Sequence, residues 1–340
     1  MGEGVGVLGT TSAPRVALAS ATTAWTTPDR RRMLQLALAT LWLLDAILQY
    51  QPYMFSRAFG GQMLAGTASG NPAGVAHTIT WAGGEIGAHA MAANAVFATV
   101  QLLIALGIAW RPTVKLALAF SIPWSLCVWW IGEGLGGTLT GRASALSGAP
   151  GAAILYALLA VLLWPIERDG SERVPFAAAR AIGESAAKVL WLVLWGCMSL
   201  LQLQAFDRSP DGLAAAMRSM AAGEPPWLAS FDNGVAKLFD GKGLEVSIVL
   251  AIMLVVVGIC VFLPAAASRA ILALAVVLAL AIWVAGENFG GILSGNGTDP
   301  NSGPLLVLLA AAYWTGPRPV PAGLDRPART RRAVPAGEGA

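Results

Sequence analysis

The sequence has little charge and few of the residues that soluble enzymes use for chemistry. Only 12% of its 340 residues are charged, while 56% are apolar, and soluble globular proteins carry about twice that share of charge. It contains no Gly-Lys-Ser/Thr phosphate loop. The two histidines fall in a single polar connection, which excludes a membrane cytochrome that holds haem between histidines of its helices.

Cysteine and net charge are also scarce. The three cysteines, Cys127, Cys197 and Cys260, lie inside apolar runs and form no CxxC pair, so neither a zinc site nor a disulfide framework is expected. A net charge of +3 without a compact basic patch gives no reason to expect a nucleic-acid partner.

Long apolar segments are what the sequence has in abundance, and they predict an all-α polytopic membrane protein with the lipid bilayer as its main partner. Eight such segments occur, at 33–50, 93–110, 114–131, 151–166, 188–205, 245–263, 269–285 and 303–316. We therefore predict eight transmembrane helices. The last segment is short, and the distribution of charge decides whether it crosses.

Basic residues favour eight crossings of the plasma membrane with both termini in the cytoplasm. In that arrangement sixteen of the twenty-two Lys and Arg residues lie inside, and six lie outside: Arg57, Arg142, Arg208, Arg218, Lys237 and Lys242. This asymmetry obeys the positive-inside rule. Removing the eighth crossing would place the basic C-terminal segment outside.

The remaining segments divide into tails, a linker and two long outer loops. Residues 1–32 and 317–340 are predicted to be flexible cytoplasmic tails, and 168–187 a cytoplasmic linker. The outer loops 51–92 and 206–244 contain aromatic residues. We expect them to form short helices resting on the outer leaflet.

The chain also resembles itself. With a shift of 154 residues, the segment beginning at Gly132-Glu133 matches the segment beginning at Gly286-Glu287, with seven identities over positions 132–150 and Pro150 on Pro304. These segments, 132–150 and 286–303, are named the Gly-Glu loops. The matches predict two parallel four-helix repeats, 33–167 and 188–316, because four crossings per repeat return the chain to the same side.

The two glutamates of the Gly-Glu loops are candidate ligand or docking residues. Glu133 and Glu287 lie near the outer membrane boundary, and each either caps the following helix or its loop, or binds a proton, cation, metal or quinone headgroup.

Polar residues in the first span of each repeat are further candidates. Asp45 lies in the middle of an apolar segment, where a charge costs about 3 kcal/mol. It either serves a ligand or bonds Gln49 or a Ser or Thr of another helix, and its repeat counterpart is Met198. Gln49 and Gln202, with Gln51 and Gln204, are expected to bond loop backbone.

The first outer loop offers a possible metal site. His77, Glu85 and His89 lie within it, and Glu85 and His89 are spaced i, i+4, as a pair of ligands on one helix face would be. No catalytic spacing motif accompanies them.

Each half resembles the DoxX-type four-helix membrane proteins. The likeness rests on the layout of the spans and on the second helix, with Gly107 and Arg111 at its inner end and Gly258 in the equivalent place. The whole chain also resembles multi-pass membrane proteins of high-GC actinobacteria. The DoxX resemblance implies a subunit associated with quinone-linked redox chemistry, and it assigns no catalytic residue.

These observations favour a non-catalytic membrane subunit of an outer-face redox or envelope process, with quinone or copper as candidate cofactors and a membrane or outer-face redox protein as partner. A small transporter or channel using Asp45, Glu133 and Glu287 is the alternative. A metal-dependent membrane enzyme at the outer face is the third hypothesis. A polar surround for Asp45 would favour transport, and a sealed apolar surround would count against it.

Overall fold

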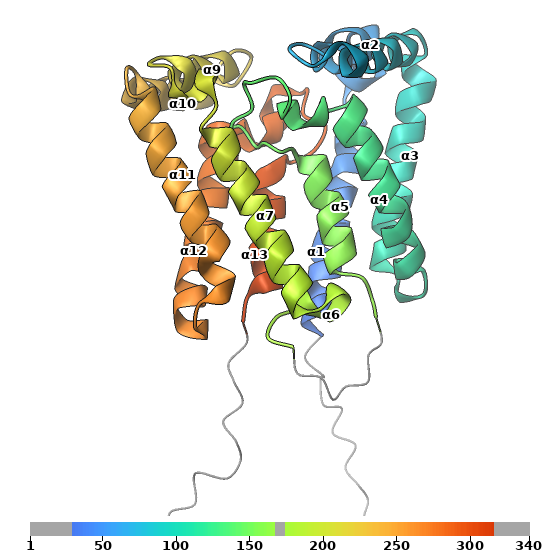
Figure 1. Ribbon diagram of the computed structural model, residues 1–340. Coiled ribbons are helices and arrows are strands. Elements are labelled where there is room, and N and C mark those ends of the chain that lie inside the picture. The colour runs from blue at the N-terminus through green and yellow to red at the C-terminus, as the bar shows by residue number, and fades with distance from the viewer. Residues whose placement is uncertain (1–28, 167–173, 316–340) are drawn as a thin grey trace, which may run out of the picture.

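The computed structural model describes residues 29–166 and 174–315, and all regular elements in those two ranges are helices (Figure 1). The longer ones are α1 (Arg30–Leu48), α2 (Ala73–Ala88), α3 (Ala90–Ala109), α4 (Val114–Ile131), α5 (Ala152–Leu162), α7 (Glu184–Gln202), α9 (Gly212–Met220), α10 (Pro226–Phe239), α11 (Gly243–Ile259), α12 (Ala265–Ala281) and α13 (Ser302–Tyr313). Short helices connect them: α6 (Ala179–Ile182), α8 (Ala205–Arg208), η1 (Pro52–Phe55), η2 (Phe59–Leu64), η3 (Arg111–Thr113), η4 (Leu135–Gly137), η5 (Cys260–Phe262), η6 (Ile282–Gly286) and η7 (Asn288–Ser294). The predicted all-α class is confirmed for this part of the chain.

A helix occupies each of the eight apolar segments, namely α1, α3, α4, α5, α7, α11, α12 and α13. Their ends differ from the predicted ones by a few residues, as expected where helix termini are inferred from hydropathy alone. Residues 30–32, which we assigned to the N-terminal tail, form the first turn of α1. The rest of that tail up to residue 28, residues 167–173 of the linker and the C-terminal tail from 316 onward lie outside the described residues.

Five of the helical segments are long and apolar enough to cross a membrane: Ala90–Ala109, Arg111–Ile131, Glu184–Gln202, Gly243–Phe262 and Ala265–Ser294. They expose large apolar side chains, including Leu116 at 73% and Leu200 at 71%. A soluble monomer rarely exposes so much apolar surface to water. These features are consistent with a multi-pass membrane protein.

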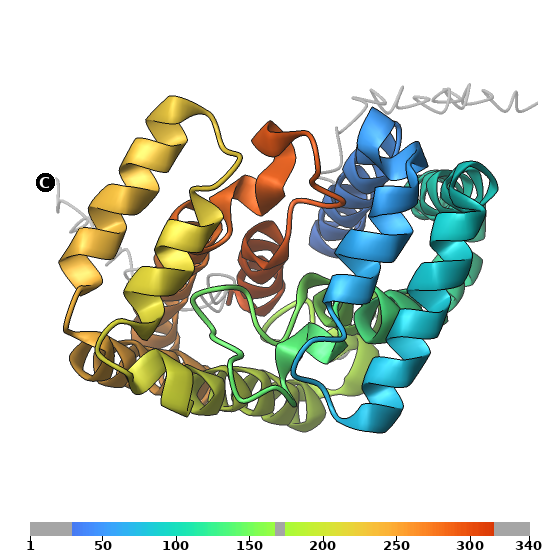
Figure 2. The same ribbon diagram turned by 90° about the horizontal axis from the view of Figure 1, so that it is seen from above.

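The other three apolar helices differ from these five for identifiable reasons. The first turn of α1 holds Arg30, Arg31 and Arg32, and Asp45 lies further along the helix. These four charged residues make α1 less apolar than the five membrane-spanning candidates. Helices α5 and α13 are short but central, since eight of the eleven residues of α5 and nine of the twelve of α13 are buried. Figure 2 shows α13 surrounded by the other helices.

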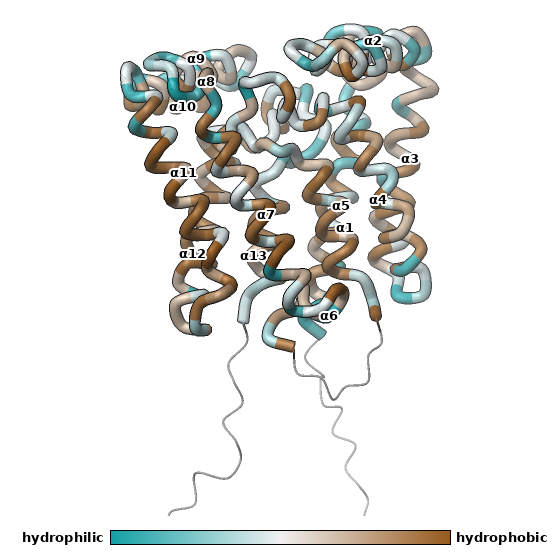
Figure 3. The backbone as a smooth tube through the Cα atoms, in the orientation of Figure 1, coloured by the Kyte–Doolittle hydropathy of each residue, from teal (hydrophilic) through white to brown (hydrophobic). Residues whose placement is uncertain are grey.

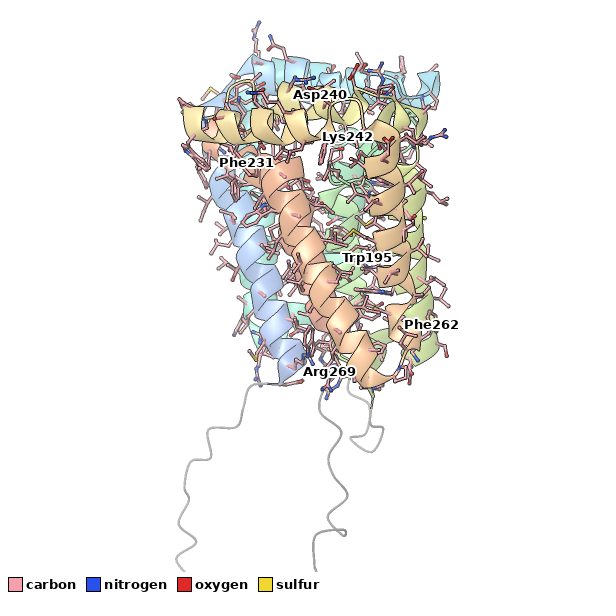
Figure 4. The ribbon with its side chains drawn as sticks, turned by 90° about the vertical axis from the view of Figure 1, so that its left-hand side faces the viewer. Trp195, Phe231, Asp240, Lys242, Phe262 and Arg269 are labelled. Carbon is pink, nitrogen blue, oxygen red and sulfur yellow. The ribbon has the colours of Figure 1, made fainter. Side chains whose placement is uncertain are left out.

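Two ends of the bundle are distinct. At one end α2, α9 and α10 lie across the tops of the long helices, and more of their residues are hydrophilic (Figures 1 and 3). We name this end, with the Gly-Glu loops, the loop face. The prediction of short helices within 51–92 and 206–244 is confirmed by α2 in the first segment and α8, α9 and α10 in the second. Figure 4 shows Phe231 and Asp240 on the loop face, with Phe262 and Arg269 at the opposite face.

At the opposite face, arginines of α1 bind the ends of two neighbouring helices. Arg30 donates hydrogen bonds to the carbonyls of Ala311 (2.8 Å) and Trp314 (2.6 Å) at the end of α13. Arg32 donates to the carbonyl of Ile108 (2.8 Å) near the end of α3. Because the last carbonyls of a helix have no partner within it and carry partial negative charge, these guanidinium groups both satisfy and neutralise the helix ends.

Candidate functional site

A cavity of about 430 Å³ lies beside Asp45, within the size range of small-molecule sites. Helices α1, α3, α4 and α5 enclose it, and the segment from η2 (Phe59–Leu64) through α2 covers it from the loop face. We name it the Asp45 cavity. Much of its lining is apolar or aromatic: Trp42, Phe59, Met63, Leu64, Trp81, Ile86, Phe97, Trp124, Val128 and Ile131.

The cavity reaches the molecular surface between α2 and α4. Three of its lining residues are exposed, Trp81 and Glu85 on α2 and Cys127 on α4. The neighbouring part of α4 exposes Leu126 and Trp130, which suit lipid or the membrane interface rather than water. The opening is therefore sideways, at the edge of the bundle.

Several polar atoms of the lining are buried and have no hydrogen-bond partner within the described residues. The acceptors are Asp45 Oδ1, Gln49 Oε1, Gln101 Oε1 and Glu133 Oε2, the donors are the indole N–H groups of Trp42 and Trp124, and the hydroxyls of Ser125 and Tyr156 can do either. Leaving such groups unpaired in a native interior is unfavourable, by about 1–3 kcal/mol each. Their concentration around one space is what a site for a polar ligand group would have.

Asp45 is the most enclosed acid of this group. Only 2% of its surface is exposed, and it is not bonded to Gln49, whose Oε1 also lacks a partner. Polar residues from three other helices, Gln101, Ser125 and Tyr156, line the same cavity. Asp45 is therefore buried beside polar residues of other helices, which is the condition we set for a transport role.

The cavity is closed toward the opposite face. Leu38, Ile108, Leu118 and Leu159 are completely buried in the core between it and the arginines of α1. The side chains of these four residues offer neither donors nor acceptors to a polar ligand.

The two glutamates occupy different environments. Glu287 is saturated, since it accepts hydrogen bonds from Ser302 N (3.1 Å), Gly303 N (3.0 Å) and the Ser302 hydroxyl. Glu133, which lines the Asp45 cavity, accepts one from Ala153 N (2.8 Å) through Oε1, while its Oε2 is buried and has no partner among the described residues. Both carboxylates thus cap the helix that follows, but only Glu133 has an oxygen free for a ligand.

Burial is the main cause of the raised pKa of the two loop acids at the cavity, Glu133 and Asp299. It raises the pKa of Glu133 to about 8, and the nearby Asp299 carboxyl adds to the rise. Burial also raises the pKa of Asp299, against the hydrogen bonds that its carboxylate accepts from Thr298 Oγ1 (2.9 Å) and Asn301 N (2.7 Å). Glu133 therefore holds its proton at neutral pH and can donate a hydrogen bond.

Glutamines from each half of the chain hold the Gly-Glu loop of the other half. Gln51 donates to the carbonyl of Gly297 (2.7 Å), and Gln204 accepts from the backbone N–H of Ala143 (2.9 Å). Gln202 accepts from the backbone N–H of Leu146 (3.1 Å) and from the Ser144 hydroxyl (3.1 Å). The predicted bonding to loop backbone is confirmed for these three residues. For Gln49 it is the backbone carbonyl, not the side chain, that is bonded, by the Asn94 amide (2.6 Å).

The two Gly-Glu loops end in matching contacts, but our ungapped register is wrong at that point. Trp129 donates to the carbonyl of Pro150 (2.7 Å), and Trp283 donates to the carbonyl of Pro300 (2.8 Å). The partner of Pro150 is therefore Pro300 and not Pro304. The second loop is four residues shorter, and glycine-rich composition concealed the gap.

The proposed metal ligands of the first outer loop are spread along an exposed surface. His77, Glu85 and His89 are all exposed, and the His89 ring lies 3.2 Å from the backbone carbonyl oxygen of Glu85. No three His, Cys, Asp or Glu side chains of the described ranges are grouped as metal ligands. Metal binding by these residues stays a prediction.

Sequence reasoning missed half of the polar lining. Gln101, Ser125 and Tyr156 are isolated polar residues in apolar helices, which is a usable signal for a site inside a membrane bundle. Asp299 gave no signal, because it lies in a loop distant in sequence from the other lining residues. Comparison with family models, with curated proteins and with solved structures finds no match for this chain.

Proposed function

We propose that this protein binds one lipid-like amphiphile in the Asp45 cavity, as a non-catalytic membrane subunit. The observation that carries the proposal is the combination of an aromatic, sideways-opening cavity with unpaired buried polar atoms in its lining. The apolar part and the opening between α2 and α4 suit a hydrocarbon chain that continues into the lipid. The polar part suits a compact head that both donates and accepts hydrogen bonds.

The chemistry of the acids favours an uncharged or cationic head. Asp45, Glu85, Glu133 and Asp299 line the cavity, and no Lys or Arg of the described ranges does. An anionic headgroup would have no counter-charge in this low-dielectric surround. A quinol is the kind of head that fits best, since its ring packs against tryptophan and its hydroxyls can bond the carboxyl oxygens. This agrees with the quinone-linked role implied by the DoxX resemblance, which remains a proposal.

We further propose eight crossings with both termini in the cytoplasm and the loop face outside. The five apolar segments and the excess of basic residues on the other side support this arrangement. Helices α5 and α13 need not match the thickness of the hydrocarbon core, because the surrounding helices separate them from lipid.

Duplication of a four-helix unit is also proposed, and the matching loop contacts of Pro150 and Pro300 support it. In that register the polar lining residues Asp45, Trp124, Ser125 and Tyr156 correspond to Met198, Leu278, Ala279 and Leu306. The second unit thus lacks these four polar groups, although Gln202 and Glu287 correspond to Gln49 and Glu133. We infer that only the first unit binds the amphiphile, while the second supports it through the interlocked loops.

A proton- or cation-coupled transporter is the second candidate, favoured by the grouping of Asp45, Glu133 and Asp299 around one cavity. The apolar layer of Leu38, Ile108 and Leu159 counts against it in this conformation. Glu287 has no place on such a path, because its oxygens are used in capping α13.

The proposal is tested by native mass spectrometry of the full chain purified in a mild detergent. The wild type should carry one amphiphile per chain at near-stoichiometric occupancy. Cys127→Trp should remove it by filling the opening, whereas Cys197→Trp, at the other exposed cysteine and outside the cavity, should retain it. Equal occupancy in both variants, or no defined adduct in the wild type, would reject the proposal.

A further inference from the structure

A second group of unpaired polar atoms lies on the loop face, away from the Asp45 cavity. Asp232 on α10 is 1% exposed, and Asn288, in the second Gly-Glu loop, is 3% exposed. Glu224 belongs to the turn between α9 and α10. Asn288 bonds Asp232 and the carbonyl of Met220, the last residue of α9 and four residues before Glu224, which sets the second Gly-Glu loop against the α9–α10 turn.

The hydrogen bonds within this cluster leave only acceptors unsatisfied. The Asn288 amide donates to Asp232 Oδ2 (2.9 Å) and to the carbonyl of Met220 (3.2 Å). Asp232 Oδ1, Asn288 Oδ1 and Glu224 Oε2 are buried and have no partner among the described residues. A group of oxygens with no remaining donor calls for a cation or for protons.

No Lys or Arg in the described ranges forms an ion pair with either acid. The ion pairs between described residues involve Asp29, Glu184 and Asp240, and none involves Glu224 or Asp232. Burial, which is the largest cause, and the adjacent Asp232 carboxylate raise the pKa of Glu224. Two acids held together at this cost, with a buried amide oxygen beside them, resemble the oxygen ligand sets of hard divalent cations.

We propose that Glu224, Asp232 and Asn288 form a Ca²⁺ site that joins the α9–α10 turn to the second Gly-Glu loop. Two carboxylates and one amide oxygen supply the protein ligands, and the half-buried position of Glu224 leaves room for water to complete the coordination. Ca²⁺ is preferred to Mg²⁺ because the ligands come from three separate segments, and Mg²⁺ requires a rigid octahedral arrangement. This inference is independent of the amphiphile site.

The test is equilibrium binding of ⁴⁵Ca²⁺ to the purified full chain in detergent. The wild type should bind one Ca²⁺ per chain saturably, and Asp232→Asn and Glu224→Gln should each weaken binding at least tenfold. Asp211→Asn is the matched control, because Asp211 is an exposed acid of the same face with no side-chain capping bond; it should bind as the wild type does.

Folding is checked in parallel by size-exclusion chromatography and by the thermal midpoint without Ca²⁺. If Asp232→Asn does not fold, Glu224→Gln decides alone, since that residue lies in a turn and is only half buried. Absence of saturable binding in the wild type, or binding unchanged by Glu224→Gln, would overturn the proposal and leave protonation as the way the cluster is neutralised.

Discussion

Asp45 shows how one residue can oppose stability and serve binding. It places a carboxyl group in the interior of a membrane bundle with an unpaired oxygen, which is unfavourable for folding and is explained by a ligand that bonds to it. The position 153 residues later holds Met198, which is also completely buried. An apolar side chain is therefore compatible with a comparable helix position.

Asp45→Asn is expected to change stability and binding in opposite directions. The neutral amide should raise the thermal midpoint of the chain, because it removes a buried ionisable group. It should also lower amphiphile occupancy roughly tenfold or more, since a hydrogen bond to a charged or acidic group contributes about 1.5–3 kcal/mol. Tryptophan fluorescence during heating and native mass spectrometry measure the two effects. A variant that is less stable and fully occupied would contradict the assigned role.

Glu133 makes stability depend on pH. Its pKa is about 8 in the folded chain and near the ordinary 4.5 when unfolded, so between these values the folded state binds more protons than the unfolded state. The contribution of Glu133 to the free energy of unfolding is then greatest below about pH 4.5 and is lost as the pH rises toward 8. The thermal midpoint of the wild type should fall from pH 5 to pH 8.

Glu133→Gln should flatten that dependence, because the amide does not titrate in this range. Glu287→Gln is the comparison at the other Gly-Glu loop, but it also replaces a carboxylate bonded by three donors, so it should lower the midpoint at every pH. An identical pH profile in wild type and Glu133→Gln would show that the Glu133 carboxyl is not the group concerned.

At the scale of elements, the Gly-Glu loops depend on glycine for two separate reasons. Gly148 has φ +87°, and a side chain there would overlap the Glu287 carboxylate of the other loop. Gly141 has φ +73° but open space around it. The first position needs both a left-handed backbone and the absence of a Cβ, and the second needs only the backbone.

Gly148→Ala should therefore destabilise the fold more than Gly141→Ala. The left-handed conformation alone costs about 1–2 kcal/mol for alanine, and Gly148→Ala adds displacement of Glu287 from the start of α13. Chemical or thermal unfolding in detergent compares the two variants. Equal destabilisation would mean that the two loops are not in contact at this point.

Sequence patterns predicted elements much better than they predicted the site. Hydropathy located the helix in each of the eight apolar segments, because burial in a membrane acts on every residue of a segment. The length and aromatic content of the outer loops predicted their short helices. The Asp45 cavity draws its lining from α1, α2, α3, α4, α5 and both Gly-Glu loops, and such proximity has no periodic signature. Asp45 and Glu133 were found because they are acids at or beside apolar segments; Asp299 was missed because it is an ordinary loop residue.

In the whole molecule, apolar helices surround a central pair, α5 and α13, most of whose residues are buried and therefore not in contact with lipid. At the opposite face, arginines of α1 donate hydrogen bonds to carbonyls at helix ends. At the loop face, Gln51 and Gln204 each bond the backbone of the Gly-Glu loop in the other half of the chain. The Asp45 cavity lies near the loop face, and its exit is sideways. This arrangement suits a protein that exchanges its ligand with the membrane leaflet at the loop face.

The proposed orientation, with the loop face outside the cell, is testable by labelling with a membrane-impermeant maleimide. The label is applied to single-cysteine variants in a background without Cys127, Cys197 and Cys260. Ser69→Cys, exposed on the loop face, should react in intact cells. Ala266→Cys, exposed at the start of α12, should react only after permeabilisation. The reverse pattern would invert the topology, and reaction of both in intact cells would contradict a membrane-spanning bundle.

The most direct measurement of the central claim is photo-crosslinking from the mouth of the cavity in native membranes. A photoreactive phenylalanine replaces Trp81, which lines the opening, or Trp110, which does not; the two are similarly exposed, at 65% and 64%. The account predicts that the Trp81 position captures one defined amphiphile, identified by mass, while the Trp110 position captures the mixture of bulk phospholipids. The same bulk mixture at both positions would contradict it.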